Sequence, residues 1–133
     1  MMLDQPARAT ENRCHVLIVE DNPDGRESLR LLLTLLGYDV EVACDGWEGV
    51  QKALRDHFDV AIVDIGLPKL DGYQVARCLR RSLGRDIRLV AYTAYDGADA
   101  ADEMRDAGFD AHLVKPVTIQ DLLPWLRQDI SRN

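Results

Sequence analysis

The chain has 133 residues, the length of one compact domain, so a second domain is not expected. Its 23 acidic and 16 basic residues give a net charge of -7, which repels nucleic acid and anionic membrane surfaces. We therefore expect neither DNA binding nor membrane binding. No apolar run reaches the length of a transmembrane helix, and residues 1–12 lack the apolar stretch of a signal peptide. A loose polar tail is predicted for residues 1–12, with one domain over residues 13–133.

Cys14, Cys44 and Cys78 are far apart in the sequence and show none of the close Cys-x-x-Cys spacing that zinc sites use. Each lies in or beside a periodic apolar segment. We expect buried, reduced thiols and a cytoplasmic protein.

The first third of the chain predicts two strands and two helices. Residues 15–19, HVLIV, are apolar throughout, as in a buried strand. Residues 22–37 predict a helix with Asn22 as its cap, Pro23 at its first position and Gly37 as its terminator, and with one stripe of leucines at 29, 32, 33 and 36. Residues 38–43 alternate apolar and polar, which favours an edge strand. Residues 45–57 then open a helix with Asp45 and Glu48 at capping-box spacing.

The remaining elements follow the same alternation. A buried strand begins at residue 60 and ends at Asp64, in VAIVDIGLP. Asp71 and Gln74 are placed to cap a helix over residues 72–82, which Gly84 ends. Strands are predicted over residues 87–94 and 111–114, with an Ala-rich acidic helix over 97–108 between them.

The last helix, over residues 118–130, contains Pro124. If Thr118 is the cap, Pro124 removes an interior hydrogen bond and kinks the helix. If Asp121 is the cap, Pro124 lies in the first turn, where a proline is tolerated. We favour Asp121 or a mixed first turn.

Strands that alternate with helices predict an α/β fold in which a parallel sheet is covered on both faces. About five strands and five helices without a repeat fit the flavodoxin-like, doubly wound order 2-1-3-4-5. In such a sheet, ligands bind beyond the carboxyl ends of the strands.

Five polar residues follow those strand ends: Glu20 and Asp21, Asp64, Thr93 and Lys115. Three neighbouring carboxylates repel one another, and a hard divalent cation removes the conflict. We expect Mg²⁺, with Mn²⁺ as a substitute. Lys115 and the Thr93 hydroxyl suit a phosphoryl group, and no Ser, Cys or His at this edge is placed as a nucleophile. Asp64 is therefore the candidate to form an acyl phosphate.

At residues 14–130 the chain strongly resembles the receiver domain of two-component response regulators. The motifs that carry the resemblance are VLIVEDNPD, VAIVDIGLPKLDGYQVARCLR, LVAYTAY and AGFDAHLVKPV, in the order and at the spacings of the family. These motifs look most like those of receivers attached to hybrid sensor kinases, although free-standing receivers share them. The chain is expected to be either a single-domain regulator or a receiver from a larger protein.

The resemblance implies a role for each matching residue. Asp64 becomes the phosphoacceptor, and Glu20, Asp21 and the backbone carbonyl of Gly66 join it as Mg²⁺ ligands. Thr93 becomes the switch hydroxyl, and Lys115 the phosphate-contacting lysine.

The resemblance also implies a cis bond between Lys115 and Pro116. His112 stands where the family often has Tyr or Phe as a rotamer switch, and Glu20 replaces the commoner Asp with a longer side chain. Gly66 and Tyr95 flank the site and are expected to tune the lifetime of the acyl phosphate.

The function implied is a signalling switch and not an enzyme, beyond self-phosphorylation from small donors and self-dephosphorylation. A sensor histidine kinase or a histidine phosphotransfer protein would donate the phosphoryl group. A downstream protein would bind the face of the fourth helix, fifth strand and fifth helix, and the chain would be a monomer or weak dimer.

Two other functions are conceivable for such a site. A metal-dependent phosphatase of the haloacid-dehalogenase type needs a general-acid Asp two residues after the nucleophile, where this chain has Gly66. An unphosphorylated scaffold of receiver shape would not need Asp64, Thr93 and Lys115 together.

Two groups of charges are expected to form solvated surfaces. Five arginines gather near the end of the third helix, at positions 77, 80, 81, 85 and 88. Six acidic residues gather around the fourth helix, at positions 96, 99, 102, 103, 106 and 110. We expect the acidic group to meet a basic surface of a partner.

Overall fold

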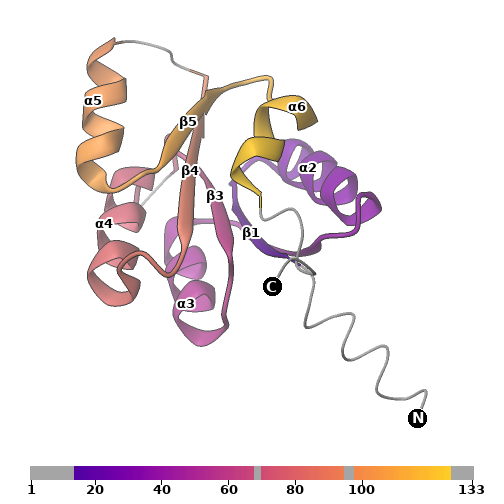
Figure 1. Cartoon of the computed structure of the whole chain (residues 1–133), viewed down its shortest axis with the longest axis horizontal. Coiled ribbons are helices and arrows are strands. Elements are labelled where there is room, and N and C mark those ends of the chain that lie inside the picture. The colour runs from indigo at the N-terminus through magenta and orange to yellow at the C-terminus, as the bar shows by residue number, and fades with distance from the viewer. Residues whose placement is uncertain (1–13, 68–69, 95–97, 127–133) are drawn as a thin grey trace.

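The computed structural model describes residues 14–67, 70–94 and 98–126. They form one five-stranded sheet in the order β2-β1-β3-β4-β5, in which every neighbouring pair is parallel (Figure 1). The predicted doubly wound fold is confirmed. Among the described residues, no helix combines the length and apolarity needed to cross a membrane.

The bounds of the elements agree closely with the predicted ones. The strands are β1 (His15–Val19), β2 (Asp39–Ala43), β3 (Val60–Asp64), β4 (Arg88–Thr93) and β5 (Ala111–Val114). The helices are α2 (Pro23–Leu35), α3 (Gly46–Arg55), α4 (Gly72–Leu83), α5 (Ala98–Ala107) and α6 (Ile119–Leu122), and a 3-10 helix, η1 (Leu123–Trp125), follows α6.

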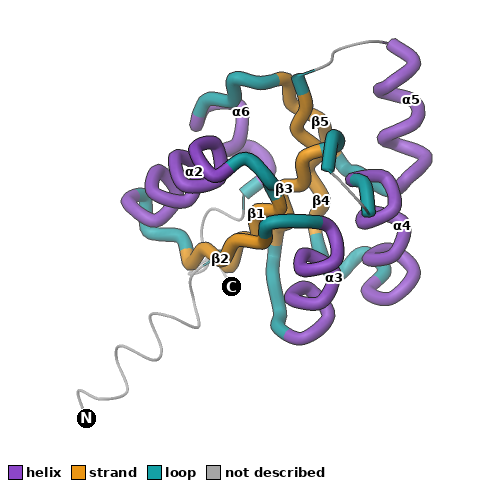
Figure 2. The backbone as a smooth tube through the Cα atoms, turned by 180° about the vertical axis from the view of Figure 1, so that it is seen from behind, coloured by secondary structure: helices purple, strands orange, loops and turns teal. Residues whose placement is uncertain are grey.

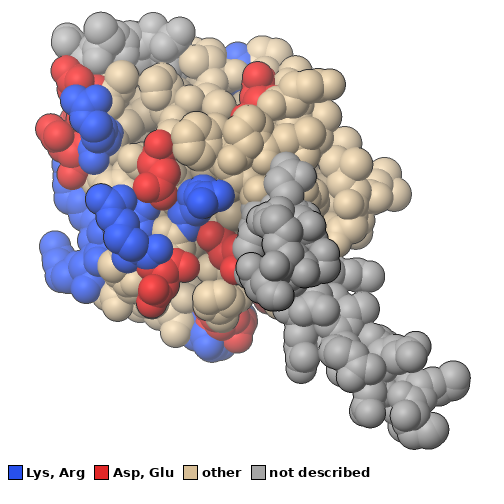
Figure 3. Space-filling model, in the orientation of Figure 1, with Lys and Arg blue, Asp and Glu red and all other residues tan. Residues whose placement is uncertain are grey.

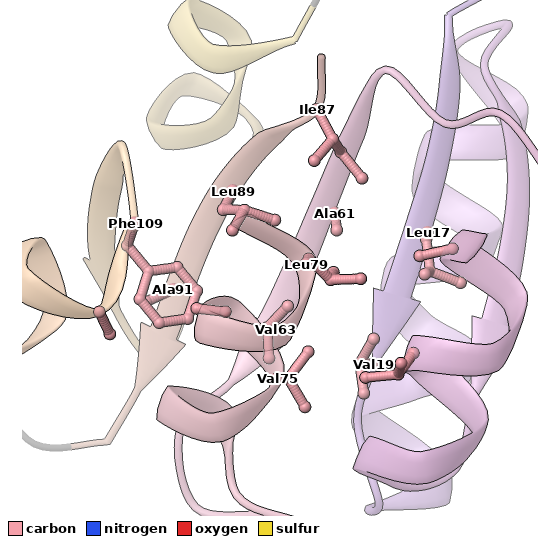
Figure 4. Close-up of a cluster of buried hydrophobic side chains, with 14 of the residues drawn as sticks. Leu17, Val19, Ala61, Val63, Val75, Leu79, Ile87, Leu89, Ala91 and Phe109 are labelled. Carbon is pink, nitrogen blue, oxygen red and sulfur yellow. The ribbon is translucent and has the colours of Figure 1, made fainter. Parts of the chain in front are cut away.

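Helices cover both faces of the sheet, with α3, α4 and α5 on one side and α2 and α6 on the other (Figure 2). Side chains alternate along each strand, so each face has its own hydrophobic cluster. The cluster under α3, α4 and α5 includes Leu17, Val63 and Leu89, which pack with Leu79 of α4 (Figure 4). Because the central strands are buried on both faces, they read as continuous apolar runs.

The predicted start and end of α2 are confirmed, but the predicted leucine stripe is only half right. The Asn22 side chain accepts from the backbone N–H groups of Asp24 and Gly25, and Gly37 follows the helix with a φ of 99°. Leu29 and Leu33 are buried against the sheet, whereas the leucines at 32 and 36 are 37% and 51% exposed. Only one edge of the stripe therefore contributes to the core.

Polar caps fix the starts of α3 and α4, which come just before and just after β3. Asp45 accepts from the backbone N–H of Glu48, and the Glu48 carboxylate reaches back to the N–H of Cys44, one residue beyond the usual partner. Asp71 and Gln74 form the full capping box that was predicted, and Gly84 ends α4 with a φ of 61°.

The preference for Asp121 as the cap of the last helix is wrong. Thr118 is the cap, and Asp121 is its capping-box partner, accepting from the N–H of Thr118. The α-helix ends at Leu122, and Pro124 lies within η1. A change to the tighter 3-10 form thus accommodates the proline. Residues 127–130 of the predicted helix lie outside the described residues.

Cysteine burial differs from the expectation. No disulfide joins the three cysteines, all of which lie in the described part of the chain, and Cys14 is buried, but Cys44 is exposed and Cys78 is half-buried. Cys44 comes directly after β2, where the edge of the sheet meets solvent.

Two of the charged residues expected on solvated surfaces are instead bonded to each other. Arg80 of α4 forms an ion pair with Asp110, at 2.6 Å between Nη2 and Oδ2, and its side chain is only 13% exposed. Figure 3 shows positive and negative side chains interleaved on the side of the molecule where α4 and α5 lie. Part of the predicted basic group is therefore structural.

Candidate functional site

The carboxyl ends of β1 and β3 bring three carboxylates together. Glu20 and Asp21 directly follow β1, and Asp64 is the last residue of β3, the neighbouring strand. Carboxylate oxygens of the three residues all lie within 4.8 Å of one another. The convergence predicted from the sequence is confirmed.

The three carboxylates differ in their exposure to solvent. Glu20 and Asp64 are 2% and 7% exposed, whereas Asp21 is exposed. The carboxylates of Glu20 and Asp64 are thus buried, and that of Asp21 is in contact with solvent. Buried charges require opposite charges or hydrogen bonds, and here the chain supplies both.

Lys115, the first residue after β5, points into the same cluster. Its Nζ lies 3.1 Å from Oε1 of Glu20 and 3.3 Å from Oδ2 of Asp64. Its backbone N–H donates to the carbonyl of Thr93 at 2.8 Å, and its bond to Pro116 is cis, as the resemblance implied. Burial alone would lower the pKa of Lys115, but the Glu20 hydrogen bond and the charge of Asp64 raise it above its ordinary value. The ammonium group therefore stays charged.

The pKa values of Glu20 and Asp64 are shifted in opposite directions. Burial raises the pKa of both groups, but hydrogen bonds from Tyr92, from the backbone of Asn22 and within the cluster overcome this for Glu20 and lower its pKa to about 2. The pKa of Asp64 is raised, first by burial and then by the neighbouring Glu20 carboxylate. Glu20 is thus the fixed negative charge, and Asp64 is the carboxylate that a nearby cation would relieve.

The residues fit a hard divalent cation. All three carboxylates offer oxygen ligands, which Mg²⁺ prefers, and in the described residues the Lys115 ammonium is the side-chain cation recorded in contact with this cluster of three carboxylates. Within the described residues, this is the only group of three or more Asp, Glu, His or Cys side chains that lie close enough together to hold a metal ion.

A hollow of about 560 Å³ opens beside the cluster, between the first half of α2 and the segment that follows β5. Glu20, Tyr92 and Lys115 line its inner end, and Leu29, Leu32 and Val117 give it an apolar wall. The hollow reaches the Glu20 and Lys115 side of the cluster, and Asp64 is not among the residues that line it.

The other predicted site residues are Thr93, His112, Gly66 and Tyr95. Thr93 ends β4 and is 7% exposed, and in the strand register it pairs with Val114, next to Lys115. His112 is half-buried on β5 and pairs with Ala91, two residues before Thr93. The side chains of His112 and Thr93 therefore belong to the same sheet face.

The backbone N–H of Gly66 donates to Oδ1 of Asp64 at 3.1 Å, whereas ligation of a metal by the Gly66 carbonyl stays a prediction. Tyr95 lies outside the described residues.

Sequence reasoning missed Tyr92. It is a buried residue of β4, and its hydroxyl donates to Oε1 of Glu20 at 2.5 Å. Its ring centroid lies 4.6 Å from Nζ of Lys115. The available signal was weak: a tyrosine inside an apolar strand needs a partner for its hydroxyl, but the sequence does not say which one.

Known proteins match the chain along most of its length. The family model described as "Response regulator receiver domain" matches residues 16–127. The response regulator MprA of Mycobacterium leprae is 39% identical over 118 residues, which make up 89% of this chain and 51% of that protein. The chain thus spans about half the length of the curated relatives it matches.

Solved structures share the fold. The receiver domain of the sensor histidine kinase PA1611 from Pseudomonas aeruginosa has a magnesium ion coordinated in its active site cleft. It is 32% identical, with a TM-score of 0.79 over 90% of this chain and 98% of that one. A Burkholderia pseudomallei response regulator with a phosphorylated aspartic acid, a calcium ion and citrate is 26% identical. Its TM-score is 0.79 over 90% of this chain and 69% of that one.

Proposed function

We propose a mechanism for this chain, which belongs to the family of response regulator receiver domains, the phosphorylation-dependent domains of two-component signalling. Receiver domains accept phosphoryl groups from histidine kinases or phosphotransfer proteins, and they are regulatory domains rather than enzymes in the ordinary sense. In this chain the phosphoacceptor would be Asp64. The observation that carries this assignment is the convergence of Glu20, Asp21 and Lys115 around the Asp64 carboxylate.

The proposed step is an in-line transfer. A carboxylate oxygen of Asp64 forms the new O–P bond while the P–N bond of a phosphohistidine breaks, and the imidazole leaves with its electron pair. Glu20, Asp21, Asp64 and the carbonyl of Gly66 would hold Mg²⁺, which neutralises charge on the phosphoryl oxygens. The magnesium-bound PA1611 receiver domain supports this assignment.

Lys115 and Thr93 would bind the transferred group. Lys115 already lies 3.3 Å from Asp64, so a small movement of its side chain brings the ammonium to a phosphoryl oxygen. The Thr93 hydroxyl would donate to a second oxygen. His112, on the same sheet face as Thr93, would follow its movement as the rotamer switch.

This movement would couple the site to the segment after β4 and to α5. A phosphoryl group adds charge and strong acceptor oxygens, and allosteric coupling of this kind is typically worth about 1–3 kcal/mol. Gly66 and Tyr95 would set how quickly water reaches the acyl phosphate. The switch would act in the cytoplasm, where thiols such as Cys14, Cys44 and Cys78 stay reduced.

The proposed output surface is the face of α5, β5 and α6. Asp102 and Asp106 of α5 are exposed, which favours a basic partner surface. Reversing both charges is expected to weaken binding of the downstream protein. Unchanged binding of that protein by the phosphorylated double variant would contradict this part of the proposal.

The test of the phosphoacceptor is direct. The protein is incubated with Mg²⁺ and acetyl phosphate, and intact mass is measured for one added phosphoryl group. Asp64→Asn and a chelator should each abolish the adduct. Absence of an adduct in the wild-type protein, with phosphohistidine donors as well, would favour a scaffold. Repeated turnover of phosphate monoesters would favour a phosphatase.

A further inference from the structure

Tyr92 contacts both members of the ion pair at the centre of the site. Its hydroxyl donates to Oε1 of Glu20 at 2.5 Å, and its ring lies beneath Nζ of Lys115 at 4.6 Å. Tyr92 and Glu20 are 5% and 2% exposed. A hydrogen bond to a carboxylate shielded from water in this way is stronger than one at the surface.

Both oxygens of Glu20 are occupied by donors of this chain. Oε1 accepts from the Tyr92 hydroxyl and from Lys115, and Oε2 accepts from the backbone N–H of Asn22 at 3.1 Å. Lys115 also contacts Asp64 and has a proposed role at the phosphoryl group. Tyr92 is therefore the side-chain partner that can stay on Glu20 when Lys115 moves away.

We propose that Tyr92 is a positioning residue that holds the Glu20 carboxylate in place for Mg²⁺. The inference rests on the proposed function, because it assigns Glu20 to the metal. A glutamate side chain rotates about several bonds, and fixing it beforehand removes an entropy cost from metal binding. Tyr92 contributes this fixing from β4, the strand that also ends in Thr93.

The length of Glu20 and the identity of Tyr92 belong together. An aspartate at position 20 would withdraw the carboxylate by one methylene, roughly 1.5 Å, which breaks a hydrogen bond to a rigid tyrosine in a packed strand. A phenylalanine at position 92 would lose the same bond from the other side. The two side chains thus form a matched pair in this chain.

The first test is Tyr92→Phe, with Mg²⁺ binding measured by isothermal titration calorimetry. We expect the affinity for Mg²⁺ to fall about tenfold, the effect of losing one hydrogen bond to a charged group. The rate of phosphorylation by acetyl phosphate should fall at low Mg²⁺ and recover at saturating Mg²⁺. A loss of general folding would not recover in this way. Tyr38→Phe, at the opposite end of the sheet before β2, is the matched control and should bind Mg²⁺ like the wild-type protein.

The second test is a double-mutant cycle with Glu20→Asp. Glu20→Asp keeps the charge but loses the Tyr92 bond, so it should weaken Mg²⁺ binding by itself. If Tyr92→Phe does not fold, Glu20→Asp alone still tests the hydrogen bond between Tyr92 and Glu20. Adding Tyr92→Phe to Glu20→Asp should then change Mg²⁺ affinity little, because the bond is already absent.

The outcomes separate this inference from the proposed function. If the wild-type protein binds Mg²⁺ and is phosphorylated, but Tyr92→Phe has the same Mg²⁺ affinity, only the role of Tyr92 is overturned. The same holds if the effects of Tyr92→Phe and Glu20→Asp are additive. If the wild-type protein does not bind Mg²⁺, both proposals fall.

Discussion

Asp64 lies at the end of β3 with 7% of its surface exposed, in contact with the Lys115 ammonium, which also contacts the Glu20 carboxylate. Burial and then Glu20 raise its pKa, so its charged form is disfavoured in the folded protein. Glu20 is the opposite case, because hydrogen bonds outweigh burial and lower its pKa to about 2. At the residue scale, one carboxylate stabilises the fold through its charge and the other destabilises it.

Asp64→Asn is therefore expected to raise the free energy of unfolding at pH 7, because it removes the disfavoured charge. A group with a raised pKa in the folded state lowers stability once the pH exceeds its ordinary value of 3.8, so the gain should vanish as the pH falls below that value. Urea denaturation of both proteins at several pH values measures this. A less stable Asp64→Asn at pH 7 would contradict the electrostatic argument.

Glu20→Gln should act in the opposite direction. A lowered pKa gives stability that is present above the ordinary value of 4.5 and lost as the pH falls toward about 2. We expect Glu20→Gln to be less stable than the wild-type protein at pH 7, with the difference shrinking below pH 4.5. The same urea series provides the measurement, and a constant difference across this range would count against it.

At the scale of elements, Arg80 connects α4 to the residue that precedes β4 and to the turn before β5. Its guanidinium donates to the carbonyls of Gly84, Ile87 and Gly108 at 2.6–2.8 Å, and it pairs with Asp110. Asp110 also accepts from the backbone N–H of Leu89, in β4. One side chain thus joins the C-terminal end of α4 to both strands that lead toward Thr93 and Lys115.

Arg80→Met is expected to lower the free energy of unfolding by about 2–4 kcal/mol, because three backbone carbonyls and a carboxylate lose their donor. The control is Arg81→Met, one residue along α4 and exposed, which should change stability by less than about 0.5 kcal/mol. Thermal or urea unfolding of the two variants side by side decides the matter. Equal effects would show that Arg80 is only a surface charge.

At the scale of the whole molecule, the fold concentrates negative charge in a chain that already carries a net charge of -7. Two of the three site carboxylates are buried beside each other, which costs stability that residues elsewhere must supply. The apolar clusters on both faces of the sheet supply it, at about 1.5–3 kcal/mol for each fully buried large side chain. A ligand that binds the site only in the folded state should therefore stabilise the whole domain.

Mg²⁺ is expected to raise the Tm of the wild-type protein, with a gain near 2.7 kcal/mol when the ion is at about 100 times its dissociation constant. Asp64→Asn should gain much less, since it lacks one of the three carboxylates. Differential scanning fluorimetry across an Mg²⁺ series, with NaCl at matched ionic strength, separates specific binding from screening. Equal gains for both proteins would argue against a metal at this cluster.

The sequence by itself determined the strands, the helices and the edge of the sheet where the site lies. Apolar periodicity and caps such as Asn22 and Asp71 are local signals, which the sequence shows directly. The carboxyl ends of parallel strands lie on one edge of the sheet, so the sequence was enough to predict that Glu20, Asp64 and Lys115 lie close together. The resemblance added the cis bond before Pro116, which no local signal predicts.

Only the tertiary structure decided which side chains touch. Tyr92 and Glu20 are 72 residues apart, and Arg80 and Asp110 are 30 apart. Periodicity tells which sheet face a residue joins, but the contact depends on the register between strands and on side-chain length. For the same reason the sequence could not tell that Cys44 is exposed or that Arg80 is nearly enclosed. Burial is a property of neighbours that are distant along the chain, and packing alone brings them together.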